Sequence, residues 1–325
     1  MKHVSILVPY DSVLAAIFDP RYIFTAVNQF LADAGKEPAF DVKLVGLAPQ
    51  VQLSGGAFAV NTDNLCADVA KTDLIIIPAL SGDMKTSIER NKDMVPWIVD
   101  QYSKGAEVTS LCLGAFLLAE TGLLDGKECS THWLFANDFR AMFPNVTLTD
   151  GSIITEAERL YSSGGAASYW NVLLHIVEKY TGREMAIRAS KFFAIEIDRK
   201  SQSPFIMFNG QKKHEDEPIK KAQEFIEQNL AGKISIEDLA TRFAIGRRHF
   251  IRRFKKATNN TPAEYIQRVK IEAAKKHLEN TPKNINEVMY DVGYTDVKAF
   301  RMVFKKITGL SPIDYKHRYN RDSAA

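Results

Sequence analysis

The C-terminal third of this 325-residue chain contains an internal repeat, which restricts the fold more than any other feature of the sequence. The segment FIRRFKKATNNTPAEY at 250–265 returns as FRMVFKKITGLSPIDY at 300–315, with matching residues 50 positions apart. The similarity continues upstream with an offset of 49, where these apolar residues match: Ile236, Leu239 and Phe243 against Ile285, Val288 and Val292. The sequence therefore predicts one supersecondary unit that is folded twice, with the shift of one residue absorbed in a turn.

Each copy predicts a helix, a short turn and a second helix. In the first copy, Ser235 followed by Asp238 is a capping-box pattern that starts a helix, and apolar residues then recur at helical spacing. The turn is expected at 244–246, and the second helix at 247–257. The second copy starts at Asn284 and turns near 293–295.

A longer helix is expected between the copies. Thr261 provides a cap, Pro262 suits the first helical position, and Glu264 lies three residues after the cap. This helix should run to about Glu279 and end before Pro282. The copies are thus predicted to lie on one connecting helix.

Charge separates the two parts of the chain. Residues 218–325 carry 22 Lys and Arg against 12 Asp and Glu, although the whole chain has a formal net charge of only +3. A strongly basic segment suggests a polyanionic partner, but a solvated lysine-rich surface would explain charge alone equally well. Two short-turn helix pairs within that segment favour helix-turn-helix DNA binding, with a helical bundle that has an exposed basic face as the alternative.

The second helix of each copy supplies the candidate DNA contacts. In a recognition helix, the N-terminal part faces base edges in the major groove, and residues further along are better placed for phosphates. The candidates for base contacts are Arg247, Arg248, His249, Arg252, Asp296, Val297, Lys298 and Arg301. The candidates for phosphate contacts are Arg253, Lys255, Lys256, Lys305 and Lys306.

Residues 218–320 resemble the DNA-binding domain of the AraC/XylS family of bacterial transcription regulators. The repeat residues carry the resemblance, above all GYTDVKAFRMVFKKITGLSPIDY in the second copy. It implies two recognition helices that read successive major grooves on one face of the DNA. The sequence departs from the pattern of this family at NNTP, residues 259–262, because the first unit in the family usually has Gly before its TP pair. Asn can also adopt the left-handed conformation that a helix end requires.

The first two hundred residues alternate strand-like and helix-like runs, which predicts an α/β fold with a doubly wound, mostly parallel sheet. The expected strands are 4–9, 40–47, 74–80 and 106–112, and the clearest helices are 24–35 and 94–105. No uninterrupted apolar stretch approaches the ~18 residues that a membrane span requires. The N-terminal apolar run indicates a first strand, not a signal peptide, and a cytoplasmic location is expected.

The stretch TSLCLGAFLLAETGLL at 109–124 has the pattern of a strand-turn-helix elbow that presents Cys112. A thiol at a helix N-terminus is expected to have a lowered pKa, and His132 could approach it. The alternative is a small buried Cys112 beside a structural His132. Three cysteines without metal-ligand spacing (Cys66, Cys112 and Cys129) indicate reduced thiols and no metal or other cofactor.

Residues 4–180 resemble the ThiJ/PfpI family, whose fold is amidotransferase-like and flavodoxin-like. The resemblance implies an elbow cysteine and, in catalytic members, a His and a Glu four residues before a proline that corresponds to Pro20; here that position is Ala16. The order of the two domains resembles the GlxA subgroup of AraC-family regulators. It implies a ligand pocket made by Cys112, Leu113, His132, Gly165 and Asn171.

These observations predict a regulator with an α/β domain at 1–199, a linker at 200–217 and a DNA-binding domain at 218–325. The first domain is expected to sense a small molecule or to mediate dimerisation. The expected partners are double-stranded DNA, a small-molecule effector, a second copy of the chain and RNA polymerase. The alternatives are a cysteine-dependent amidase, hydratase or glyoxalase-like enzyme, and a regulator that senses oxidation through Cys112.

Overall fold

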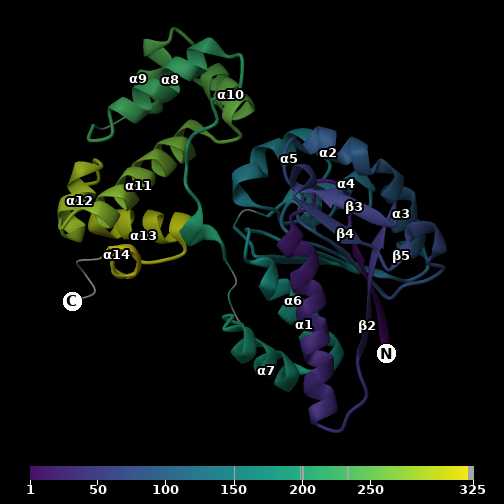
Figure 1. The fold of residues 1–325 in the computed structure, drawn as a ribbon. Coiled ribbons are helices and arrows are strands. Elements are labelled where there is room, and N and C mark those ends of the chain that lie inside the picture. Colours follow the sequence, from purple (N-terminus) through teal and green to yellow (C-terminus); the bar gives the residue numbers. More distant parts are fainter. Residues whose placement is uncertain (150, 198, 200, 233, 321–325) are drawn as a thin grey trace. The chain divides into compact units, whose positions relative to one another are not determined.

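The computed structural model describes residues 1–149, 151–197, 199, 201–232 and 234–320 (Figure 1). The chain divides into two compact units, Met1–Gln202 and Ser203–Ala325. The first unit is an α/β domain, and the second consists of helices. The segment that the sequence marks as a linker is divided between them, because Gln202 belongs to the first unit and the residues from Ser203 onward belong to the second.

The first unit is built on a seven-stranded sheet in the order β10-β11-β7-β6-β1-β2-β5. Neighbouring strands are parallel except at the edge, where β10 and β11 are antiparallel. The central strand β6 is buried along its whole length, as expected for a parallel sheet covered on both faces. The bounds are β1 Lys2–Leu7, β2 Phe40–Gly46, β5 Asn64–Leu65, β6 Leu74–Ile77, β7 Glu107–Ser110, β10 Ile154–Ala157 and β11 Leu160–Ser163.

Helices cover both faces of this sheet (Figure 1), which confirms the predicted doubly wound α/β fold. On one face lie α1 Leu14–Asp33, α6 Tyr169–Thr181 and α7 Arg183–Phe193. On the other lie α2 Met84–Asn91, α3 Val95–Ser103, α4 Gly114–Glu120 and α5 Ala136–Met142. Two small sheets pair β3 Gln50–Leu53 with β4 Phe58–Asn61, and β8 Glu128–Cys129 with β9 Thr147–Leu148.

Helix α1 begins at Leu14, ten residues before the predicted start at 24. Pro20 lies inside the helix and has no N–H to donate, so the sequence around it does not look helical. Burial overrides this local cost, since Ile17, Pro20 and Phe24 all face the core. The prediction was therefore wrong at this boundary for a tertiary reason.

The second unit contains the two predicted helix pairs (Figure 1). Its helices are α8 Glu217–Gln228, α9 Ile236–Arg242, α10 Arg247–Thr258, α11 Pro262–Asn280, α12 Ile285–Asp291, α13 Val297–Thr308 and α14 Pro312–Tyr319. The predicted caps are confirmed: Ser235 accepts a hydrogen bond from the Asp238 N–H at 3.0 Å, and full capping boxes form at Thr261 with Glu264 and at Asn284 with Glu287. Asn259 is left-handed with φ 54°, like Gly309 with φ 75°.

The repeat in the sequence is also a repeat in packing. In the first copy, the rings of Phe254 and Tyr265 lie 5.2 Å apart in an edge-to-face arrangement. In the second, Phe304 and Tyr315 lie 5.4 Å apart in the same arrangement. Each tyrosine hydroxyl donates to a glutamate of a preceding helix, Glu227 and Glu279 respectively. The two copies therefore have equivalent aromatic cores.

Candidate nucleic-acid interface and elbow site

Helix α10 exposes a basic N-terminal half. Arg247, Arg248, His249 and Arg252 are all solvent-exposed, while Phe250 between them is fully buried. The Arg247 Nε lies 3.1 Å from Glu237, and Nη2 of Arg252 lies 3.2 Å from Nδ1 of His249. The guanidinium groups of Arg247 and Arg252 thus have neighbouring polar partners, and Arg248 is exposed between them along the chain.

Helix α13 exposes a different set of side chains. Val297, Lys298 and Arg301 are solvent-exposed, as the sequence analysis expected of base-contacting residues. Asp296 is also exposed, but its carboxylate accepts a hydrogen bond from the Ala299 N–H at 2.7 Å and caps the helix. Met302 is 65% exposed beside Arg301, a position that the sequence analysis did not single out. An exposed apolar side chain on a recognition helix can contact a thymine methyl group.

The candidate phosphate contacts lie in the last turns of both helices. Lys255, Lys256, Lys305 and Lys306 are exposed. Arg253 differs, because its Nε and Nη2 donate to the two carboxylate oxygens of Asp216 at 2.9 and 2.8 Å. This bidentate pair holds the pKa of Asp216 below its usual value. Arg253 thus ties α10 to the start of α8 and has an internal partner.

The elbow predicted at Cys112 is present in the first unit. Strand β7 ends at Ser110, Cys112 adopts φ 54°, and α4 starts at Gly114. A side chain at Gly114 would place its Cβ 2.5 Å from the Pro78 carbonyl oxygen, so the turn requires glycine here. The Cys112 N–H donates to the Ser163 hydroxyl at 3.2 Å, and the Thr131 hydroxyl donates to the Cys112 carbonyl at 3.0 Å.

The elbow buries the thiol of Cys112. Cys112 is 4% exposed, and burial raises its pKa to about 12. The expectation that the helix N-terminus lowers this pKa is therefore wrong, because desolvation of the thiolate outweighs the single backbone N–H that favours it. Burial also raises the pKa of Cys66 to about 11 and that of Cys129 to about 12.

His132 makes a local hydrogen bond. Its Nδ1 accepts a hydrogen bond from the Leu134 N–H at 3.1 Å, and burial lowers its pKa. Within the described ranges, no hydrogen bond joins His132 to Cys112. The position at which the family resemblance implied a glutamate is Ala16, which is fully buried. The carboxylate nearest to Ala16 along that helix is Asp19, and it accepts a hydrogen bond from the Tyr169 hydroxyl at 2.6 Å.

The side chain of Gln202 packs beside the elbow. Gln202 is 2% exposed, and its Nε2 donates to the carbonyl oxygens of Thr131 and Ser152 at 3.1 and 3.0 Å. A Cβ at Gly164 would lie 2.1 Å from that nitrogen, and one at Gly165 would lie 3.6 Å from Oε1. The sequence analysis placed Gln202 in the linker, since a polar residue in a Ser- and Pro-containing stretch carries no local sign of burial.

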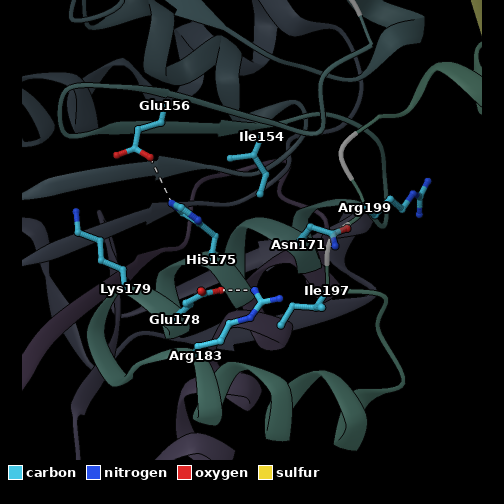
Figure 2. Close-up of a pocket in the computed structure, with 9 residues that line it drawn as sticks. All are labelled: Ile154, Glu156, Asn171, His175, Glu178, Lys179, Arg183, Ile197 and Arg199. Carbon is cyan, nitrogen blue, oxygen red and sulfur yellow. Dashed lines mark hydrogen bonds and ion pairs between the residues drawn. The ribbon is translucent and has the colours of Figure 1, made fainter. Parts of the chain in front are cut away.

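Asn171 lines a different cavity, of about 520 Å³, beside α6 (Figure 2). Cys112, Leu113, His132 and Gly165 are not among its lining residues, and a pocket shared by all five predicted residues stays a prediction. The lining residues are Ile154, Glu156, Asn171, His175, Glu178, Lys179, Arg183, Ile197 and Arg199. Four of these residues recur at helical spacing on α6: Asn171, His175, Glu178 and Lys179. This spacing is visible in the sequence and could have indicated the cavity.

Charged groups of both signs surround this cavity (Figure 2). His175 Nε2 lies 3.4 Å from Glu156, and Arg183 donates to Glu178 at 2.8 Å. The Asn171 amide donates to the Glu196 carbonyl at 2.6 Å. The size is within the range of small-molecule sites, and the lining suits a small polar molecule. Among the described residues, no group of three or more His, Cys, Asp or Glu side chains could hold a metal ion.

No described helix combines the length and the apolar character that crossing a membrane requires.

Comparison with known proteins places both units in families. The DJ-1/PfpI family matches residues 25–179, and a helix-turn-helix domain matches residues 239–318. The HTH-type transcriptional regulator GbdR of Pseudomonas aeruginosa is 28% identical over 264 residues, which cover 78% of this chain and 67% of that regulator.

Two solved structures match about three-fifths of the chain. A candidate transcriptional regulator from Vibrio parahaemolyticus matches with a TM-score of 0.53 and 25% identity, covering 59% of this chain and 98% of that chain. An AraC family transcriptional regulator from Pseudomonas putida matches with a TM-score of 0.51 and 18% identity, covering 59% of this chain and all of that chain, and supports the fold alone. The chain is therefore a DNA-binding transcriptional regulator that joins a DJ-1/PfpI family domain to an AraC-type helix-turn-helix domain.

Proposed function

We propose that the regulator recognises a two-part DNA site, with α10 and α13 each reading bases in one major groove. The observation that carries this proposal is the duplicated core, which presents two helices that each expose polar and basic side chains N-terminally and two lysines C-terminally. The proposed base contacts are Arg247, Arg248, His249, Arg252, Val297, Lys298 and Arg301, with Asp296 positioning α13. The proposed phosphate contacts are Lys255, Lys256, Lys305 and Lys306, without Arg253, because Asp216 engages its guanidinium.

The test is selection of bound sequences from a pool of random 40-base-pair duplexes with the full-length protein at physiological salt. Two enriched half-sites about one helical turn apart support the proposal. Salt-sensitive binding without an enriched motif contradicts it, because that behaviour is expected of a basic domain that contacts only phosphates.

We also propose that the DJ-1/PfpI domain senses a small polar effector in the cavity beside Asn171. The mixed charges and the volume of that cavity support this role. A panel of amino acids and dicarboxylic acids, tested by thermal shift on the wild type and on His175→Ala, examines it. A ligand that stabilises the wild type but not His175→Ala supports the site; equal stabilisation of both proteins places the ligand elsewhere.

Dimerisation is the second candidate role for this domain. Tyr22 of α1 and Phe192 of α7 are each 56% exposed, and their rings lie 6.5 Å apart. Two adjacent exposed aromatic rings favour contact with a second copy of the chain. Sedimentation of the wild type and of Tyr22→Ser/Phe192→Ser examines this role; equal masses for the two proteins contradict it.

A cytoplasmic location and contact with RNA polymerase also belong to the proposed function.

We propose no catalysis at the elbow. Ala16 supplies no carboxylate, His132 makes a local hydrogen bond, and the pKa of Cys112 is about 12. Iodoacetamide should therefore modify Cys112 in the folded protein at pH 8 at least about tenfold more slowly than in urea, because very little thiolate is present at that pH. Mass spectrometry of the tryptic peptide measures the rates. Equally rapid modification in both conditions would restore the enzyme and redox-sensor alternatives.

A further inference from the structure

A buried lysine lies in the connecting helix α11 of the DNA-binding unit. Lys270 is 6% exposed, and its ammonium group makes two hydrogen bonds, to the carbonyl oxygens of Gly232 and Gly293, each at 3.2 Å. Burial lowers its pKa.

The two carbonyl groups belong to the segment that leads into the first helix-turn-helix copy and to the turn of the second copy. Gly232 lies between α8 and α9, at the entry to the first copy. Gly293 lies in the turn between α12 and α13 of the second copy. One side chain of the connecting helix therefore holds both copies through backbone atoms.

The second copy also packs directly on the segment that leads into the first. Gly293 has φ 72°, and a Cβ there would lie 2.6 Å from the Leu230 carbonyl oxygen and 2.7 Å from that of Ala231. The same Cβ would lie 2.7 Å from Lys270 Nζ. Lys270 and Gly293 thus form a close junction between the copies at which no additional side-chain atom can be accommodated.

The hydrogen bonds of Lys270 fix the positions of the two backbone segments at this junction. Within the part of the chain that the structure describes, no carboxylate forms an ion pair with its ammonium, which is held by carbonyl dipoles and faces the ring of Tyr294 at 5.6 Å. A buried ammonium that loses either carbonyl becomes unsatisfied at a large energetic cost. Both segments are therefore held against a single ammonium group, at the end of one lysine side chain of α11.

We propose that Lys270 is a positioning residue that sets the separation of α10 and α13, and thereby the spacing of half-sites that the regulator accepts on DNA. This inference rests on the proposed two-part recognition of DNA. Spacing of half-sites is a geometric property of the two reading helices, so it is sensitive to a change in their relative position that leaves each helix intact.

The same helix contains a matched control. Lys275 is 3% exposed and lies one and a half turns further along α11. Its ammonium donates to the Ile206 carbonyl and to Glu272, at 2.6 and 2.7 Å. It contacts the segment before α8 and neither of the two turns, so its loss removes a buried lysine without releasing the junction.

The experiment compares full-length wild type, Lys270→Met, Lys270→Arg and Lys275→Met in selection from the random duplex pool. The readout is the distribution of distances between the two enriched half-sites. In the wild type we expect one spacing to be preferred about tenfold over spacings one base pair longer or shorter. Lys270→Met should reduce that preference to about twofold while both half-site motifs persist. Lys270→Arg should not restore it, because the junction has no room for the larger guanidinium, and Lys275→Met should retain it.

Each outcome decides the inference. A Lys270→Met pool with the wild-type spacing preference overturns it, and so does a Lys275→Met pool that broadens equally, because the effect would then be a general loss of stability. If circular dichroism shows that Lys270→Met is unfolded, Gly293→Ala replaces it and should broaden the spacing from the opposite side of the junction. Unchanged spacing in Gly293→Ala contradicts the inference. A wild-type pool without a two-part motif overturns the proposed function, and the inference with it.

Discussion

The two helix-turn-helix copies share a core and differ on their surfaces. Phe254 and Phe304 occupy equivalent, fully buried positions. On the exposed side, Arg248 corresponds to Lys298, and Arg252 corresponds to Met302. The duplication therefore retained the residues that form the fold, while the residues available to DNA became different. Two copies of one scaffold can in this way read two different half-sites.

The copies also differ in how they are held. In the first, Arg253 of α10 forms the bidentate ion pair with Asp216, which caps α8. The equivalent position in the second copy is Val303, which is 8% exposed and packs in the apolar core. In the first copy, a charged pair thus attaches α10 to the start of α8. In the second copy, apolar packing holds α13 at the equivalent position.

The largest expected effect tests the equivalence of the cores. Phe254→Ala and Phe304→Ala should each lower the free energy of unfolding by about 3–5 kcal/mol, because each removes a fully buried ring. Urea unfolding followed by circular dichroism measures both. Values that differ by more than about 2 kcal/mol would show that the two cores are not equivalent.

The next effect tests whether the surfaces read different half-sites. Arg248→Ala and Arg301→Ala should each lower affinity for the selected DNA by about 1–3 kcal/mol and relax base preference in one half-site only. Titration of duplexes that carry a mutation in one half or the other measures the effect. If both variants relax the same half-site, the assignment of one helix to each half is incorrect.

A smaller effect should be the same in both copies. Lys255→Ala and Lys305→Ala should each weaken binding to all sequences equally and reduce the slope of log affinity against log salt by about one unit. Specific and random duplexes, titrated over a range of salt concentrations, provide the comparison. A loss restricted to the selected site would indicate base reading at that lysine.

The smallest effect is confined to the first copy. Because Arg253 lowers the pKa of Asp216, the ion pair stabilises the folded state above the ordinary carboxyl pKa of 3.8 and is lost as the pH falls through the lower folded value. Asp216→Asn keeps a capping side chain but removes the charge, and should lower the free energy of unfolding at pH 7 by less than about 1 kcal/mol, since the pair is partly exposed to solvent.

In acid, the free energy of unfolding of Asp216→Asn should depend less on pH than that of the wild type. Unfolding curves between pH 2 and 7 measure this dependence, and Asp296→Asn serves as the matched control, because that exposed cap has no arginine partner among the described residues. Equal pH dependence in the wild type and in Asp216→Asn would exclude the attachment as its source.

Much of the DNA-binding unit could be predicted because its signals are local. Caps such as Ser235 and Asn284 act within one turn of helix, and the repeat of Phe254 as Phe304 is visible in the chain itself. The limits of α1 could not be predicted in this way, since Pro20 is helical only because the core buries it. The cavity beside Asn171 could be predicted less well, because its lining residues, among them Ile154 and Ile197, come from segments that are separated along the chain.

The sequence by itself determined the two domains, the duplicated helix pairs and the identity of the exposed basic residues, because periodicity, capping and charge act between residues that are close along the chain. Only the tertiary structure decided that the Cys112 thiol is desolvated, that the Gln202 amide is buried against the carbonyls of Thr131 and Ser152, and that Arg253 pairs with Asp216. It also decided that Lys270 joins the two copies. These properties depend on contacts between distant segments, and burial sets the energy of a thiol, an amide or an ammonium only after those segments have come together.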